Sequence, residues 1–239
     1  MKLHQLTLLW AILLISLSLS AQSKKKLTPD NYKSWNRIKD VKIATNGSNV
    51  LYTLSGERTN KELHIYNTRS KDTYVFPRAD QPSIDYSGNI FMWKSVADVD
   101  TIREQKRRKV KKEELPGDSL FIFDVVTNNT SVINTLKSYK TPDEYGGFVA
   151  YQLEPGGHPS DSLLLSKFKK KESKEDGSRM ILRYLSSEKE DTFYFVKDYE
   201  FAEEGKRLVY HTSGDDSLRM GGVHVVDLMS GNDLEILQT

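Results

Sequence analysis

Cysteine is absent from the 239 residues, and this absence alone excludes several classes of protein. The chain has no disulfide framework, no thiolate-ligated zinc or iron–sulfur site, no cysteine nucleophile and no lipidated cysteine. Segments rich in glycine, serine or proline that would divide the chain are also missing. Hydrophobic residues make up 37 %, which is too many for a disordered chain. We therefore expect a folded region held together by its core.

Long hydrophobic runs are missing beyond the N-terminus. Lys2 precedes an almost uncharged stretch from Leu6 to Leu19, and small residues follow it. This order is typical of a secretory signal peptide, and the stretch is shorter than the roughly 20 residues that a membrane span needs. We expect a signal peptide in residues 1–22, cleaved between Ser20 and Gln22, and no permanent membrane anchor. Residues 23–239 are then periplasmic or secreted.

The net charge is small, at +2, and does not indicate which kind of partner the protein binds. The charges are nevertheless segregated, because residues 103–112 hold seven basic and one acidic residue, and residues 167–179 hold six basic and three acidic ones. Phe168 is the one aromatic residue in these two stretches, so base stacking has little support and we expect no nucleic-acid binding. The stretches are interpreted as solvated loops, and a protein partner for them stays open.

Four similar segments follow one another along the chain. Each has a glycine followed by an apolar strand that ends on an aromatic residue, as expected for a tight hairpin turn and a pleated strand. The four segments are Gly47–Tyr52, Gly88–Trp93, Gly147–Tyr151 and Gly205–Tyr210. Equivalent positions in every repeat favour packing between repeats over a ligand site for Tyr52, Trp93, Tyr151 and Tyr210.

Two further strands follow each of these segments, and a short one precedes it. The second strands are predicted at 63–66, 120–123, 180–184 and 223–226, and the third at 74–76, 131–133, 193–195 and 234–237. The preceding strands are predicted at 41–44, 82–85, around Tyr139 and at 199–201. Each repeat thus reads as a four-stranded antiparallel meander.

Meanders repeated in this way are typical of an all-β, β-propeller-like fold with one meander per blade. We predict four consecutive blades at about 38–77, 78–135, 136–197 and 198–239. The second and third are longer because their second hairpins contain the two basic stretches, on the same face of the propeller. Thr28, Pro29 and Asp30 predict the start of a short N-terminal helix that continues to about Trp35.

Residues for catalysis are not apparent. The chain contains no Gly-x-Ser-x-Gly, and the Asp-Ser-Leu at 118–120 recurs at 161–163 and 216–218, where a turn leading into a strand explains it. We therefore expect Ser119 not to be catalytic. Glu203 and Glu204 form an acidic pair in a turn, where solvent exposure explains them.

The histidines also give no candidate for a metal or cofactor site. The histidines beyond the signal are His64, His158, His211 and His224, and no two stand at a metal-ligand spacing. His64 and His224 occupy equivalent strand positions and are interpreted as structural. We assign no catalytic, cofactor-binding or metal residue, and expect no cofactor.

A family resemblance rests on three groups of residues. Leu27–Ile38, Tyr52–Leu54 with Glu62–Tyr66, and Phe201–Leu208 resemble the N-terminal region of secreted bacterial serine peptidases of the prolyl oligopeptidase and dipeptidyl-peptidase family. The resemblance implies a β-propeller that precedes an α/β-hydrolase domain with a Ser-Asp-His triad and that restricts access to peptide substrates. The sequence ends at Thr239 before any such domain, so no catalytic residue of the family is transferred.

Two functions stay open. In the first, the chain is the non-catalytic propeller portion of such a peptidase and gates or orients peptide substrates for a hydrolase domain that this chain lacks. In the second, it is a self-contained secreted binding module, with a protein partner on the hairpin-loop face. The DNA after codon 239 distinguishes them, because a peptidase needs further blades and Gly-x-Ser-x-Gly.

Overall fold

A computed structural model describes residues 28, 31, 35–56, 59–111, 114–155, 171–214 and 220–238. The chain divides into two compact units, Met1–Trp35 and Asn36–Thr239. The predicted signal peptide and most of the predicted helix from Thr28 lie outside the described residues. All the strands of the described chain belong to the second unit.

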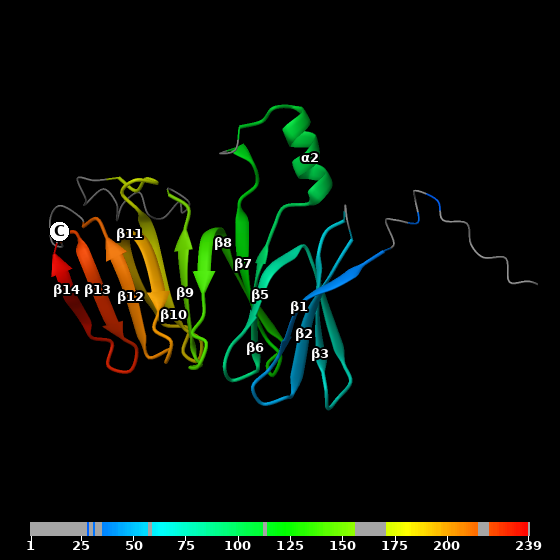
Figure 1. Cartoon of the computed structure of the whole chain (residues 1–239), viewed down its shortest axis with the longest axis horizontal. Coiled ribbons are helices and arrows are strands. Elements are labelled where there is room, and N and C mark those ends of the chain that lie inside the picture. Colours follow the sequence, from blue (N-terminus) through cyan, green and yellow to red (C-terminus); the bar gives the residue numbers. More distant parts are fainter. Residues whose placement is uncertain are drawn as a thin grey trace, which may run out of the picture. The chain divides into compact units, whose positions relative to one another are not determined.

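Strands dominate this unit (Figure 1). In chain order its elements are β1 (Arg37–Ile43), β2 (Asn49–Ser55), β3 (Glu62–Asn67), β4 (Thr73–Pro77), β5 (Ala79–Ile84), β6 (Ile90–Ser95), α2 (Val99–Arg107), β7 (Asp118–Asp124), β8 (Asn129–Lys140), β9 (Phe148–Leu153), β10 (Ser178–Tyr184), β11 (Glu190–Phe201), β12 (Arg207–Thr212), β13 (Gly222–Asp227) and β14 (Asp233–Gln238). Every strand predicted from the repeats is present.

The strands pair antiparallel with their neighbours in sequence. They form a four-stranded sheet, β1 to β4, and a ten-stranded sheet, β5 to β14, each in chain order. The predicted all-β, antiparallel architecture is thus confirmed. The predicted division into four sheets of four strands is not confirmed.

The ten-stranded sheet arises because two strands are twice the usual length. β8 pairs with β7 through Leu136 and with β9 from Leu136 onward, and the register shifts at this residue. β11 is shared in the same way: it pairs with β10 up to Val196 and with β12 from Val196 onward. Thr135 and Phe195 have positive φ angles of 58° and 54°, which mark the bends. The ladder therefore continues where the sequence predicted a boundary between repeats.

The glycine turns adopt the backbone that the sequence predicted. Gly47, Gly88, Gly147 and Gly205 have φ angles of 67°, 79°, 93° and 68°, in the left-handed region that favours glycine. Each turn joins the first strand of a repeat to the second, so the hairpins have the predicted register.

The core lies between consecutive repeats and not within one. One apolar cluster joins β2 to β4 with β5 to β7, a second joins β6 to β8 with β9 and β10, and a third joins β9 to β11 with β12 and β13. Trp93 is 1 % exposed and its ring lies 4.4 Å from that of Phe76, in the preceding repeat. Tyr151 and Tyr210 are also buried, so the predicted packing role of these aromatics is confirmed.

Residues 103–107 of the first basic stretch belong to helix α2, so the interpretation of this part as a loop was wrong. The Asp98 carboxylate accepts hydrogen bonds from the backbone N–H groups of Asp100 (2.9 Å) and Thr101 (3.1 Å), which caps α2. No residue of α2 is buried, so the expected solvation holds. Of the second stretch, residues 167–170 lie outside the described residues. Its last two residues, Ser178 and Arg179, begin β10 and are buried, so the interpretation as a solvated loop was wrong there. None of the helices in the described part of the chain is long and apolar enough to cross a membrane.

Candidate functional site

The first strands of three successive repeats together line a pocket. β1, β5 and the second half of β8 contribute its walls, which enclose about 400 Å³. The lining residues are Asp40, Lys42, Gln81, Pro82, Ser83, Tyr139, Lys140 and Thr141. We call it the inner-strand pocket. It is rich in hydrogen-bonding groups and holds both signs of charge.

Tyr139 fixes one wall of the inner-strand pocket. Its hydroxyl donates to the carbonyl oxygen of Gln81 and lies 3.3 Å from the Ser83 hydroxyl, so β8 is held against β5. Burial raises the pKa of Tyr139 well above its ordinary value. The phenol therefore stays neutral at physiological pH and acts as a donor.

Lys140 supplies a cation to the same wall. Its ammonium group pairs with Glu200 on β11 and lies 5.4 Å from the centre of the Tyr199 ring. The Lys140 side chain remains 33 % exposed. It can therefore contact both the protein and a ligand in the pocket.

Asp40 supplies a carboxylate from β1. One of its oxygens accepts a hydrogen bond of 2.7 Å from the Thr53 hydroxyl. Asp40 and Gln81 have positive φ angles of 52° and 50° at the bulges of their strands. The bulges interrupt the alternation of side chains, and they place Lys42 and Ser83 in the lining as well. The chemistry available is hydrogen bonding and ion pairing to a polar ligand.

Sequence reasoning missed this pocket. Its residues lie in three repeats, and Lys140 is far in the sequence from Asp40 and Lys42, which stand two residues apart on β1. The available signal was their position, because each stands in the first strand of a meander. Such strands approach one another only once the repeats are arranged around a common axis.

Ser119 is placed as predicted. It lies in β7, at the start of the strand, and its hydroxyl donates to the side-chain oxygen of Asn134 at 3.1 Å. The two other Asp-Ser-Leu copies, at 161–163 and 216–218, lie outside the described residues.

The equivalent histidines occupy equivalent surroundings. His64 stacks on Tyr52 with ring centres 5.1 Å apart, and His224 stacks on Tyr210 at 5.0 Å, both with 11° between the planes. His224 is buried, at 3 % exposure. His211 is half-buried on β12, and His158 lies outside the described residues. Among the residues that the structure describes, no group of three or more histidine, aspartate and glutamate residues could hold a metal ion.

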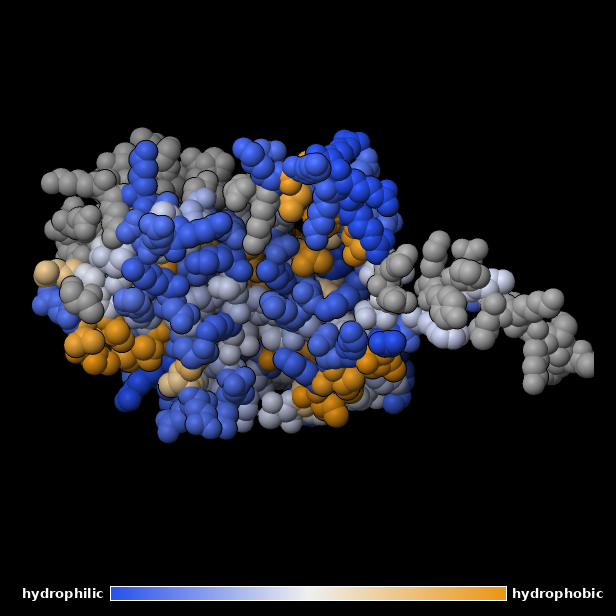
Figure 2. All heavy atoms as spheres, turned by 45° about the horizontal axis from the view of Figure 1, so that its top comes forward, coloured by the Kyte–Doolittle hydropathy of each residue, from blue (hydrophilic) through white to orange (hydrophobic). Residues whose placement is uncertain are grey.

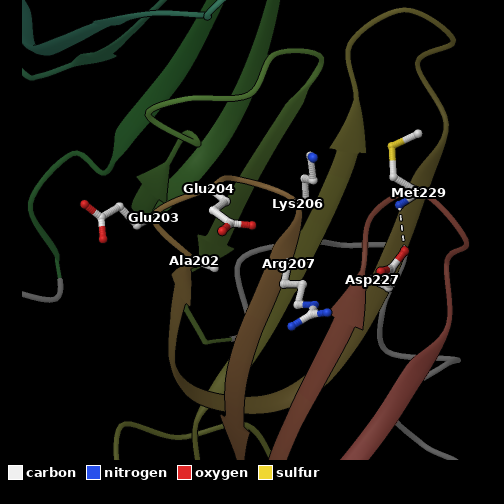
Figure 3. A pocket seen from close by; sticks show the side chains of 7 residues that line it. All are labelled: Ala202, Glu203, Glu204, Lys206, Arg207, Asp227 and Met229. Atoms are coloured by element: carbon white, nitrogen blue, oxygen red, sulfur yellow. Dashed lines mark hydrogen bonds between the residues drawn. The ribbon is translucent and has the colours of Figure 1, made fainter.

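Glu203 and Glu204 are exposed in the turn before Gly205, as predicted. They line a second pocket, of about 370 Å³, which Figure 3 shows from close by. Its other lining residues are Ala202, Lys206, Arg207, Asp227 and Met229. In this view Glu203 points away from the other labelled side chains. The pair does not converge on one point, as two carboxylates that hold a single amino group would.

Comparisons with known proteins identify the fold alone. No protein-family profile and no curated protein matches the sequence. Among solved structures, one from a study of two prolyl endopeptidases matches with a TM-score of 0.51, 12 % identity, and coverage of 87 % of this chain and 30 % of that one. The β-propeller domain of the Trilobed protease from Pyrococcus furiosus matches with a TM-score of 0.49 and 9 % identity, and the match covers 87 % of this chain and 59 % of that one. Acylaminoacyl peptidase from Pyrococcus horikoshii matches with a TM-score of 0.48 and 8 % identity, and the match covers 87 % of this chain and 33 % of that one.

The chain thus spans less than two thirds of the length of these proteins. The resemblance to propeller regions of prolyl-oligopeptidase-type proteins holds at the level of the fold.

Proposed function

We propose that residues 23–239 are the non-catalytic propeller portion of a secreted serine peptidase of the prolyl oligopeptidase type. In this proposal the propeller gates and orients peptide substrates for a hydrolase domain. The observation that carries it is the inner-strand pocket, which stands on the first strands of successive repeats in a fold shared with a prolyl endopeptidase structure.

The proposal interprets the two sheets as four blades. β8 and β11 each pair with one set of neighbours in their first half and another in their second. If each serves as the last strand of one blade and the first of the next, the fourteen strands of the described residues make four meanders of four. The first strands of these meanders then lie nearest the axis, where propellers have a channel.

The lining suits an extended peptide. A peptide backbone offers carbonyl oxygens and N–H groups at regular intervals. The Lys140 ammonium can donate to the carbonyl oxygens, and the hydroxyl oxygen of Tyr139, whose proton goes to Gln81, can accept from the N–H groups. The Asp40 carboxylate can pair with a peptide's amino terminus, and Lys42 with its carboxylate. No covalent step is assigned to these residues.

Peptide binding by the purified chain tests the proposal. Fluorescence anisotropy with a labelled, proline-containing octapeptide should give saturable binding that Lys140→Met weakens at least fivefold. Lys111→Met, in the segment after α2, is the matched control and should change nothing. Absence of saturation at submillimolar protein, or equal affinity in both variants, would contradict the role of the pocket.

The hydrolase part of the proposal needs its own measurement. The DNA that follows codon 239 should encode further strands and a Gly-x-Ser-x-Gly segment, in frame or after a frameshift. The longer product should then hydrolyse the same octapeptide, and Lys140→Met should raise KM more than it lowers kcat. A downstream region that encodes neither feature would contradict the peptidase proposal and favour the function as a secreted binding module.

A further inference from the structure

Both basic stretches leave the ten-stranded sheet at the same end. Leu136 of β8 pairs with Asp118, where β7 begins, and with Leu153, where β9 ends. Gln152 pairs with Met180, near the start of β10. Residues 103–112 precede β7, and most of 167–179 precedes β10. The register therefore brings the two stretches to one end of the sheet, where Figure 1 shows α2.

The base of the first insertion is fixed to the sheets. Lys94 on β6 and Asp118 on β7 form an ion pair of 2.7 Å across its two ends. The Asn60 side chain, from the first repeat, donates to the Asp98 carboxylate at 2.6 Å and accepts from the backbone N–H of Val99 at 3.0 Å. Because the start of α2 is held and none of its residues is buried, its basic end projects into solvent.

The carboxylates of α2 already have cationic partners. Asp100 pairs with Arg103 at 2.8 Å, and Glu104 pairs with Arg108. Hydrophilic side chains cover the part of the molecule that holds α2 (Figure 2).

The other exposed cations of the two stretches have no such partner. We call the ones that the structure describes the basic end: Lys106, Arg107, Lys109, Lys111, Lys171 and Lys174. In the described part of the chain, no acidic side chain forms an ion pair with any of these six residues. Their charges are therefore available to a partner.

The rest of the chain has the opposite charge. Residues 103–112 and 167–179 hold 13 of the 35 basic residues but only four of the 33 acidic ones. The net charge of +2 thus separates into a cationic end and an acidic remainder. This asymmetry turns the basic end toward an anionic partner and keeps the remainder away from it.

The arrangement of the basic end favours a broad partner. Three strand spacings separate β7 from β10, which is roughly 14 Å at about 4.8 Å for each spacing. A partner must cover this distance to meet both stretches at once. A bilayer presents headgroups over any such distance, and it attracts clustered lysine and arginine residues without a complementary shape. Residues 103–112 contain no aromatic side chain on which a base could stack.

We infer that the basic end is a peripheral membrane-binding surface for a bilayer rich in anionic headgroups. Its ammonium and guanidinium groups pair with the phosphates of the lipids at the surface. The attachment is reversible and needs no segment that spans the membrane. The inference depends neither on peptide binding nor on any residue beyond β14.

Co-sedimentation with lipid vesicles tests this inference. Residues 23–239 are used, because the apolar residues 6–19 could bind lipid themselves. Partitioning should be at least about tenfold stronger on phosphatidylcholine vesicles with about 30 % phosphatidylglycerol than on phosphatidylcholine alone. It should be lost when salt rises from about 50 mM to about 500 mM, because salt screens exposed charges. Equal partitioning on both kinds of vesicle, or none on either, would overturn the inference.

A triple variant assigns the binding to the basic end. Lys106→Gln with Arg107→Gln and Lys109→Gln removes three exposed cations, so circular dichroism should not change. Partitioning on the phosphatidylglycerol vesicles should fall at least about tenfold. Unchanged partitioning of the folded variant would contradict the assignment.

The matched control loses the same three charges at the opposite end of the sheets. Arg69→Gln, Lys71→Gln and Lys189→Gln change exposed residues in the turns between β3 and β4 and between β10 and β11. Strands of six residues place these turns roughly 20 Å from the basic end, beyond the Debye length of about 10 Å at 0.1 M salt. The control should keep wild-type partitioning within about twofold. An equal loss in both variants would show that net charge alone causes the binding.

Soluble polyanions separate a bilayer from another anionic partner. Polyglutamate and a short DNA duplex are added at the same concentration of negative charge as the vesicles. Each should displace less than about half of the bound protein, because neither is a broad surface that meets both stretches together. Complete displacement by either would overturn the inference and assign the basic end to an acidic protein or to nucleic acid.

Discussion

The hydroxyl of Tyr199 lies 2.9 Å from that of Ser138, and this contact joins the second halves of β11 and β8. One repeat earlier, the Tyr139 hydroxyl lies 3.3 Å from that of Ser83 on β5. The first strands of neighbouring repeats are not joined to one another by ladder hydrogen bonds. The tyrosine–serine pairs connect these strands instead. The same device in two successive repeats indicates that it positions the strands that line the inner-strand pocket.

Removing the Tyr199 hydroxyl should therefore destabilise the fold. Tyr199→Phe leaves the partly buried Ser138 hydroxyl without this partner, and the expected loss is about 1–2 kcal/mol of unfolding free energy. A urea titration followed by tryptophan fluorescence measures it. Ser138→Ala should add little to the Tyr199→Phe variant, because the two act as a pair. Tyr86→Phe, at a residue that is 44 % exposed, is the control. Fully additive effects would show that the contact is not energetically coupled.

Trp93 tests the packing between the first two repeats. Its ring lies 4.4 Å from that of Phe76 and 5.4 Å from that of Phe121, and it is 1 % exposed. Trp93→Ala should cost about 3–5 kcal/mol of unfolding free energy, as for other large-to-small changes in cores. Guanidinium titration followed by circular dichroism measures the loss. Val126→Ala should cost under ~0.5 kcal/mol, as for an ordinary surface change, and a similarly small loss at Trp93 would place it outside the core.

Local signals account for what the sequence predicted correctly. A glycine with positive φ followed by alternating apolar residues defines a hairpin without reference to the rest of the chain. All four such turns, from Gly47 to Gly205, formed as expected. The aromatic residue that ends each strand was buried wherever another repeat precedes it, and Tyr52 in the first repeat is only half-buried.

Features that depend on other repeats were not predictable in the same way. The continuity of β8 and β11 depends on neighbours on both sides, and a local pattern cannot show that Leu136 and Val196 serve two ladders. The inner-strand pocket combines residues from three repeats. Helix α2 is different, because a local signal for it was present: Asp98 is a suitable N-cap residue ahead of helix-forming residues. A solvated loop was predicted instead, because the density of basic charge was given more weight.

Asp98 gives α2 a pH dependence. The hydrogen bond from the Asn60 side chain, followed by that from the Thr101 backbone, lowers the pKa of Asp98 below its ordinary value of 3.8. Because the pKa is lowered on folding, the contribution of this cap is complete above the unfolded pKa and is lost as pH falls through the folded pKa. NMR should show that the Asp98 carboxyl titrates below 3.8 and that exchange protection of the Thr101 amide falls with it, below about pH 4.

The matching variant is Asp98→Asn, which keeps an acceptor but does not titrate. Its Thr101 protection should be independent of pH in the same range. A carboxyl that titrates at or above its ordinary value would contradict the capping geometry.

Two glycines with almost the same backbone separate conformational strain from steric contact. Gly47 and Gly205 have φ angles of 67° and 68°, but a Cβ at Gly47 meets nothing within 4 Å, whereas at Gly205 it would lie 2.6 Å from the Cβ of Tyr145 and 2.8 Å from that of Pro142. Gly47→Ala should cost about 1–2 kcal/mol of unfolding free energy, the strain of an L-residue in this region. Gly205→Ala should cost about 1–3 kcal/mol more, because the turns must separate. Parallel urea titrations give the difference. Equal losses in the two variants would mean that the third and fourth repeats do not touch at this turn in solution.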